Sequence, residues 1–283
     1  MRHTITEKVI HGLMCLGTYI IVFVIGYIIF NIVWNGLPVI NWEFLTGMPR
    51  KSGTEGGILP AIIGTFLLVL GAITIAFPLG MAAAVYLSEY ASQGRFTRTI
   101  RLAIVTLAGV PSIVFGLFGL GLFVIFLGFG ASLLSGCLTL ACMILPTIIA
   151  SSEEALRTVP QLFREGSLAL GATKWQTIYK NVLPYSVSGI LTGSILSVGR
   201  AAGETAPILL TVAAFYLPKL PKSIFDQVMA LPYHLYVLAT QHPDIDKALP
   251  MQYGTALVLL VLVLGFNLAA ILLRLHVRKK YRW

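Results

Sequence analysis

Six stretches of this sequence are long and apolar enough to cross a lipid bilayer, and no other feature restricts the fold as strongly. A helix needs about 20 apolar residues to span the hydrocarbon core. Only 11% of the 283 residues are charged, whereas a soluble domain carries about 25%. The chain is therefore predicted to be all-α, a single domain (1–283) with six transmembrane helices. The six stretches lie at about 13–34, 59–87, 102–127, 133–150, 186–214 and 253–275.

Basic residues are distributed unequally between the two sides that these spans define. Fourteen of the 20 lysines and arginines fall in 1–12, 88–101, 151–185 and 274–283, all on one side. Five fall on the opposite side, and one, Arg200, lies within a span. Cytoplasmic segments of membrane proteins carry such an excess, so we expect both termini to be cytoplasmic. The asymmetry also explains the net charge of +9, and we expect no nucleic-acid partner.

Two connecting segments are too long to be simple turns. The inner segment, 151–184, is amphipathic in two pieces at helical spacing, which predicts two short helices separated at Gly171, the second ending at Pro184. The outer segment, 215–252, contains five prolines and several aromatic residues, which indicates a structured external surface.

No metal site is expected in this chain. The outer segment contains His234, His242, Asp244 and Asp246, but these residues lack helical or zinc-finger spacing. The three cysteines, at positions 15, 137 and 142, lie in apolar stretches without CxxC spacing and without nearby histidines, which favours buried hydrophobic side chains.

One apolar stretch, "SVGRAAGETAPILLTV" (197–212), contains two charged residues, Arg200 and Glu204. A lone charge at the centre of a bilayer costs about 2.5–3.5 kcal/mol on insertion scales. Residues four apart share a helix face and can pair, but pairing does not remove the cost of desolvating both ions. Two interpretations remain open: a buried salt bridge that fixes helix packing, or a functional site on a translocation path.

In the functional interpretation Arg200 meets an anion on this path. A guanidinium stays charged when desolvated, and its planar fork of donors suits tetrahedral oxyanions. Glu204 would orient the arginine and prevent the anion from being held too tightly. Ser197 and Thr205 would add hydroxyl donors.

The sequence contains none of the motifs expected of an enzyme that acts alone. It lacks GxxxxGK[ST], the loop that cradles nucleotide phosphates, and it also lacks HExxH and GxSxG. We therefore expect a transport subunit without catalytic residues or a cofactor of its own. If transport is driven by ATP, the nucleotide and its Mg²⁺ must be bound by a separate ATPase.

The inner segment resembles the "EAA" loop of ABC importer permeases, the element that inserts into a groove on the ATPase. The resemblance lies in "ALGATKWQTIYKNVLP". It assigns ATPase coupling to Glu165, Gly171, Ala172, Leu183 and Pro184, although the two alanines that follow the glutamate in the family are absent here.

Three further motifs resemble the phosphate-specific ABC permeases, PstA-type subunit, within the binding-protein-dependent transport inner-membrane component family. They are "GRAAGETAP", "EGGILPAIIGT" and "GVPSIVFGLFGLG". The resemblance implies an ABC type I importer permease fold in the bacterial inner membrane. It also implies a PstC-type permease partner, two copies of a cytoplasmic ATPase and an external phosphate-binding protein. By the same resemblance, Arg200 and Glu204 are the intramembrane charge pair of the family.

Two alternatives stay open. The first is an ABC permease for another oxyanion or anionic solute. The second is a proton-coupled secondary transporter in which the Arg–Glu pair relays protons. Many secondary transporters contain internal repeats, and no repeat is evident here, which argues modestly against the second alternative.

Overall fold

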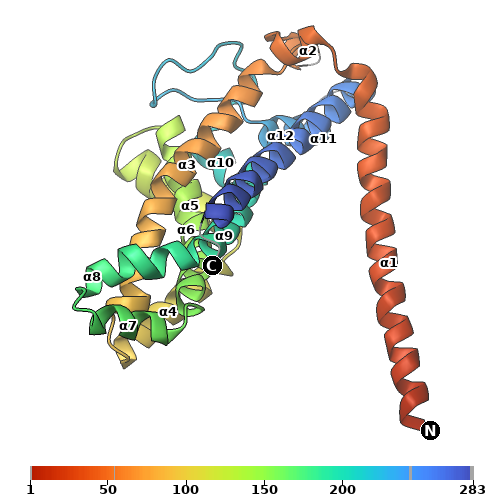
Figure 1. The fold of residues 1–283 in the computed structure, drawn as a ribbon. Coiled ribbons are helices and arrows are strands. Elements are labelled where there is room, and N and C mark those ends of the chain that lie inside the picture. Colours follow the sequence, from red (N-terminus) through yellow and green to blue (C-terminus); the bar gives the residue numbers. More distant parts are fainter. Residues whose placement is uncertain (1, 54, 242–243, 281–283) are drawn as a thin grey trace.

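The computed structural model describes residues 2–53, 55–241 and 244–280, and it is almost entirely helical (Figure 1). Five helical segments are long and apolar enough to span a membrane: Glu7–Val39, Leu59–Tyr90, Leu133–Arg157, Lys174–Gly203 and Lys247–His276. A sixth span exists only if the helix pair Arg95–Ala108 and Ser112–Phe126, bent by 102°, is counted as one. The predicted all-α, multi-span class is confirmed.

The α-helices are α1 (Arg2–Gly36), α2 (Trp42–Thr46), α3 (Leu59–Val85), α4 (Arg95–Ala108), α5 (Ser112–Gly119), α6 (Leu133–Arg157), α7 (Gln161–Ala169), α8 (Lys174–Thr177), α9 (Leu183–Gly203), α10 (Ala206–Thr211), α11 (Leu231–Thr240) and α12 (Ile245–Lys280). π-helical turns at Tyr86–Tyr90, Leu120–Phe126 and Ile178–Val182 continue α3, α5 and α8. Short 3-10 turns occupy Leu37–Val39 and Lys51–Gly53, and β1 (Pro49–Arg50) pairs antiparallel with β2 (Glu55–Gly56).

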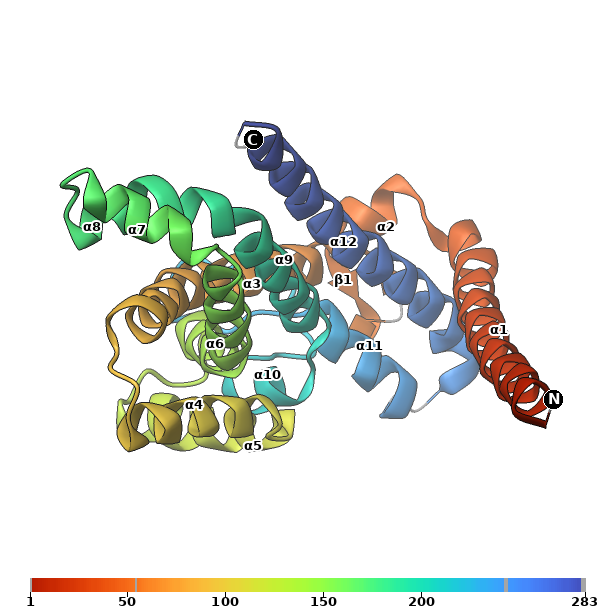
Figure 2. The ribbon, with the colours of Figure 1, turned by 60° about the horizontal axis from the view of Figure 1, so that its bottom comes forward.

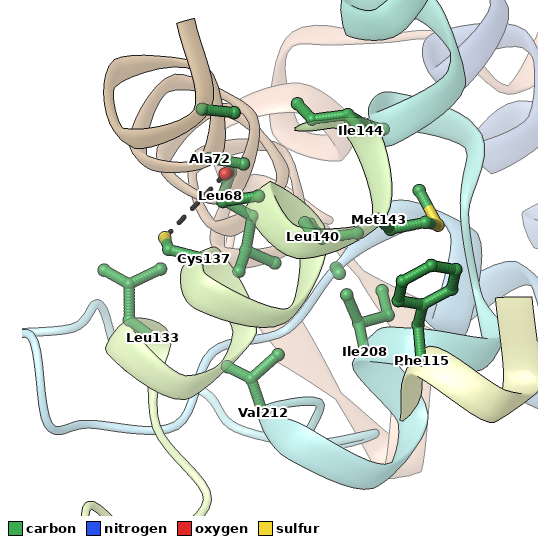
Figure 3. Close-up of a cluster of buried hydrophobic side chains, with 14 of the residues drawn as sticks. Leu68, Ala72, Phe115, Leu133, Cys137, Leu140, Met143, Ile144, Ile208 and Val212 are labelled. Atoms are coloured by element: carbon green, nitrogen blue, oxygen red, sulfur yellow. Dashed lines mark hydrogen bonds between the residues drawn. The ribbon is translucent and has the colours of Figure 1, made fainter. Parts of the chain in front are cut away.

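The centre of the fold is the packing of α3 against α6 (Figure 3). Leu68 of α3 lies against Leu140 of α6, and the thiol of Cys137 is 3.8 Å from the carbonyl oxygen of Leu68. A side chain at Gly71 would collide with Cys137. Small residues let two helices approach closely in a membrane. Gly71 therefore allows α3 and α6 to pack tightly against each other.

The apolar stretch 186–214 is not a single helix. α9 ends at Gly203, Glu204 is extended (φ −75°, ψ 133°), and a separate six-residue helix, α10, follows. The cause is Pro207, which in a continuous helix would clash with the carbonyl group four residues earlier, that of Gly203. Pro207 instead occupies the first turn of α10, where its missing N–H has no cost.

The stretch 102–127 is also broken. α4 starts at Arg95 and ends at Ala108, and α5 starts at Ser112 directly after Pro111, which is extended (φ −57°, ψ 140°). The proline again excludes a continuous helix. This segment therefore changes direction instead of crossing straight.

Pro184 does not end a helix, so the prediction for the inner segment is wrong at this point. α8, the π-helical turn Ile178–Val182 and α9 form one continuous span from Lys174 to Gly203. A π turn inserts an extra residue into the helix, and this turn lies where the ring of Pro184 would otherwise meet the carbonyl group of Lys180. The inner segment is therefore continuous with the helix that carries Arg200.

Helix α1 stands apart from the rest of the chain over most of its length (Figure 1). It meets the body near its C-terminal end, where Gly36 lies against Tyr253 and Leu257 of α12. α7 and α8 project from the opposite side of the body in both views (Figure 2).

Candidate translocation site and coupling surface

Arg200 and Glu204 form the ion pair expected from their spacing, with 3.3 Å between Nε of Arg200 and Oε1 of Glu204. Arg200 lies in the last turn of α9, and Glu204 is the first residue beyond it. The Arg200 side chain is 37% exposed in the single chain and that of Glu204 is 17% exposed. The pair is therefore not sealed among the side chains of its own subunit.

The guanidinium of Arg200 is mostly unsatisfied. Among the described residues it donates one hydrogen bond, from Nε to Glu204. A guanidinium has five N–H donors, so both terminal nitrogens have no hydrogen-bond partner among the described residues. Available donors of this kind can form a bidentate contact with an oxyanion.

The small residues of α9 serve two purposes. Gly193 lets α9 approach Ser151 of α6, and Gly199 lets it approach Asn267 of α12, because an added Cβ would contact these side chains closely. Gly203 has open space around it, since a Cβ added there would meet no heavy atom within 4 Å. The open space at Gly203 lies between Arg200 and Glu204 in the sequence, whereas the contact of Gly199 with Asn267 lies directly before Arg200.

Ser197 and Thr205 differ in their placement. The hydroxyl of Ser197 donates to the carbonyl of Gly193 at 3.0 Å, and the side chain is 1% exposed. Ser197 is therefore occupied within α9 in this conformation. Thr205 is half-buried directly before α10 and makes no side-chain capping bond, so its hydroxyl is not used to hold that helix.

The predicted coupling residues surround a sharp turn between two short helices. α7 carries Glu165, which is exposed, and Gly171 follows with φ +83°, a conformation that favours glycine. The amide of Ala172 bonds the carbonyl of Ser167 at 3.2 Å and closes the turn. Gly171 thus separates two helices as expected.

Leu183 and Pro184 lie elsewhere, at the start of α9 and away from the turn at Gly171. They line an open cleft together with Tyr179, Lys180 and Val187.

The same turn presents an apolar surface, which we call the coupling surface. Its side chains are large, hydrophobic and exposed, and four of the six lie outside the candidate membrane spans. They are Leu162, Phe163, Leu168, Leu170, Trp175 and Tyr179. Leu170 is 91% exposed, and exposed apolar patches of this kind mark interaction sites.

Residues 76–283 match the family described as "Binding-protein-dependent transport system inner membrane component". The chain belongs to this family. It is 34% identical over 294 residues to "Probable ABC transporter permease protein YqgI" of Bacillus subtilis, which covers 99% of each chain. It is 40% identical over 228 residues to "Phosphate transport system permease protein PstA 1" of Mycobacterium tuberculosis, covering 80% of this chain and 72% of the relative.

The solved structures that resemble this permease show the same fold. The inward-facing MetNI methionine ABC transporter matches with a TM-score of 0.60 and 18% identity, covering 78% of this chain and 94% of the other. An amino acid ABC transporter with histidines matches with a TM-score of 0.56 and 16% identity, covering 77% and 93%. The predicted ABC importer permease fold and the multi-pass inner-membrane location are confirmed.

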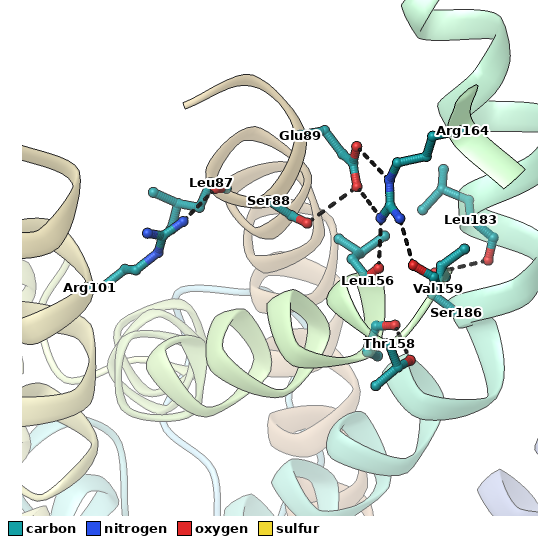
Figure 4. A network of polar contacts seen from close by, with 11 residues as sticks. Leu87, Ser88, Glu89, Arg101, Leu156, Thr158, Val159, Arg164, Leu183 and Ser186 are labelled. Carbon is teal, nitrogen blue, oxygen red and sulfur yellow. Dashed lines mark hydrogen bonds and ion pairs between the residues drawn. The ribbon is translucent and has the colours of Figure 1, made fainter. Parts of the chain in front are cut away.

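One interaction at the base of the permease was missed from the sequence. Arg164 of α7 binds Glu89 with two hydrogen bonds, Nε–Oε2 at 3.2 Å and Nη2–Oε1 at 2.8 Å (Figure 4). The partners are 75 positions apart, so no local spacing rule could have paired them. The available signal was an arginine in a predicted amphipathic helix with no acidic residue three or four positions away.

The segment 215–252 offers no group of metal ligands among the described residues. No cluster of three or more His, Cys, Asp or Glu occurs there, and His242 lies outside the described residues. His234 is fully buried, its ring stacks on Phe215, and burial lowers its pKa to about 4. The segment is structured around α11, as its prolines and aromatics indicated.

Proposed function

We propose that this permease is a subunit of an ATP-driven inorganic phosphate importer and forms half of the translocation path. The observation that carries the proposal is the Arg200 guanidinium, which is partly exposed and has unused donors beside open space at Gly203. Relatives named as phosphate permeases support phosphate as the solute, including one from Methanocaldococcus jannaschii that is 35% identical over 92% of this chain and 91% of its own.

The break between α9 and α10 is suited to such a path. Non-helical backbone at membrane depth is tolerated where it lines a cavity or is covered by protein. Glu204 lies at that break and neutralises Arg200 at rest. An arriving phosphate would compete with Glu204 for the guanidinium and would be released when the pair re-forms, which keeps binding weak enough for transport.

A second permease completes the path in this proposal. The span Glu7–Val39 is apolar, and its most hydrophobic window has no buried residue within the single chain. A helix in this position packs against lipid or against another subunit. We assign the missing subunit as a PstC-type permease, so that α1 of this chain lies along its surface.

In this proposal the ATPase contacts the permease at the coupling surface and moves it. We propose that two copies of a cytoplasmic ATPase bind ATP and Mg²⁺, and that one of them holds α7 and the Gly171 turn in a groove. α8 and α9 form one helical span from Lys174 to Gly203. Displacement of α8 is therefore carried to Arg200 over about 39 Å, the length of 26 helical residues.

The orientation follows from charge. The excess of lysine and arginine in the segments that include α7 and both termini places these on the cytoplasmic side. The segment 215–252, with α11, then faces outward and is assigned as the docking surface for an external phosphate-binding protein.

The decisive experiment is reconstitution of the full complex in proteoliposomes, with labelled phosphate as the solute. Uptake should require ATP, the ATPase and the binding protein, and should be unaffected by a proton gradient. Arsenate, sulfate and molybdate serve as competitors. Competition by sulfate or molybdate stronger than that by phosphate would assign another oxyanion, and uptake driven by a proton gradient alone would assign a secondary transporter.

A further inference from the structure

We propose that Arg164 is a positioning residue that ties α7 to the transmembrane helices, so that movement imposed on α7 is passed to α3 and α6. The inference rests on the proposed function, since it assumes that an ATPase moves α7. It concerns a different site from the Arg200–Glu204 pair, and none of the predicted coupling residues is part of it.

Every nitrogen of the Arg164 guanidinium is used. Besides the two bonds to Glu89, Nη1 donates to the carbonyl of Val159 at 2.6 Å and Nη2 donates to the carbonyl of Leu156 at 2.9 Å. Leu156 belongs to the last turn of α6. One side chain therefore joins α7, the C-terminal end of α6 and the π-helical turn that continues α3 (Figure 4).

Apart from the three-residue connection 158–160 that joins α6 to α7, few contacts hold α7 to these helices. No residue of α7 is buried. Its other side-chain contacts lead to the following span, through the ring pair of Phe163 and Tyr185 (centroids 4.7 Å apart) and the hydrogen bond from Thr177 to Ser167 at 3.0 Å. Among the described residues, no other hydrogen bond or ion pair joins α7 to α3 or α6.

Arg164 bridges an open gap. A cleft of about 620 Å³ separates the end of α3 from α7 and α8, and both Glu89 and Arg164 line it. The Arg164 side chain is nevertheless only 13% exposed, and that of Glu89 only 8%. A bidentate pair fixes direction as well as distance, so this link can transmit displacement across a gap that apolar packing does not fill.

Glu89 is placed to receive this displacement. It lies in the π-helical turn Tyr86–Tyr90, which continues α3 without a break, so Leu59–Tyr90 is one span. A pull on Glu89 therefore acts on the end of a membrane-spanning helix.

A second ion pair provides a matched control. Arg101 of α4 binds Glu153 of α6 at 2.7 Å, and the side chains are 22% and 11% exposed. This pair lies at the same end of the molecule and is similarly buried, but it does not touch α7. Glu153 also pairs with Arg157 at 2.7 Å, so neutralising Glu153 removes two ion pairs that do not involve α7 and tests general loosening at this end of the molecule. Neutralising Glu89 tests the link to α7.

The experiment compares Glu89→Gln with Glu153→Gln in the reconstituted complex, measuring phosphate transported per ATP hydrolysed and the amount of ATPase that co-purifies. For Glu89→Gln we expect the transport-to-hydrolysis ratio to fall by about tenfold or more while the ATPase stays bound. For Glu153→Gln we expect a ratio within about twofold of wild type. A normal ratio in Glu89→Gln, or equal losses in both variants, would overturn the proposal.

A distance measurement tests the link without relying on transport. Spin labels at Gln93 and Gln161, both exposed across the cleft, report whether α7 and the end of α3 move as one body. The wild-type distance should not change when ATP binds, and in Glu89→Gln it should broaden or lengthen. A wild-type distance that changes with ATP would contradict the link. A wild-type complex that transports no phosphate would instead contradict the proposed function.

Discussion

Two of the arginine–glutamate pairs in the permease differ in almost every physical respect. Arg164–Glu89 is bidentate, joins residues 75 positions apart and has side chains 13% and 8% exposed. Arg200–Glu204 has one bond of 3.3 Å, joins residues four positions apart and is 37% and 17% exposed. The first guanidinium also binds two backbone carbonyls, whereas the second binds no other described residue.

The difference separates a structural charge from a charge available to a ligand. A guanidinium whose nitrogens all donate to protein groups holds those groups together and has no donor left for a solute. A guanidinium with unused donors can exchange its carboxylate for another oxyanion. We therefore propose mechanical coupling for Arg164 and solute contact for Arg200.

The largest expected effect is that of Arg200→Gln. Removal of the charge should reduce phosphate uptake by about a hundredfold or more, because the oxyanion loses its cationic partner in the membrane. Uptake and subunit co-purification should be measured on the same preparation. If the subunits fail to co-purify to the same extent that uptake falls, Arg200 acts in helix packing and not in solute contact.

Charge reversal of each pair should separate the two roles more finely. Glu89→Arg combined with Arg164→Glu should regain about a tenth or more of the uptake lost by the single Arg164→Glu change, because an inverted pair still links α7 to α3. Arg200→Glu combined with Glu204→Arg should regain nothing, since the cation then lies beyond the end of α9. The measurement is uptake by the four single variants and the two doubles. Equal recovery in both doubles would show that Arg200 acts only through its partner.

A smaller effect is expected at the turn that follows Arg164. Gly171 has φ +83°, and an alanine there costs about 1–2 kcal/mol. Gly171→Ala should weaken ATPase binding by about fivefold, the equivalent of 1 kcal/mol. The control is Gly94→Ala, outside α7 and α8, where a Cβ also meets nothing within 4 Å. The affinity of the ATPase for each variant is measured by titration. Equal affinities for the two variants would show that the turn at Gly171 does not contribute to ATPase binding.

The helical class, the apolar spans and the separation of two short helices at Gly171 could be predicted because each follows from local pattern. The local Arg200–Glu204 contact was predictable for the same reason. The break after Gly203 was signalled by Pro207 but was hidden by the uninterrupted hydrophobicity of 186–214. The continuous helix through Pro184 was not predictable, since it depends on a π turn that no residue pattern marks.

The Arg164–Glu89 pair could not be predicted either. It depends on how the end of α3 meets α7 in space, which is decided by the packing of α3 on α6. Long-range contacts of this kind carry no periodicity in the sequence. Likewise, the buried hydroxyl of Ser197 shows that sharing a helix with a site residue does not place a side chain on the site.

The most direct test of the account is the reactivity of a thiol beside Arg200 in the assembled complex. Gly203→Cys keeps the Arg200–Glu204 pair and points into open space. In a background without native cysteines, it should react with an anionic methanethiosulfonate reagent, phosphate should slow the reaction, and the buried control Ser197→Cys should stay unreactive. An unreactive thiol at 203, or one indifferent to phosphate, would contradict a solute path at Arg200.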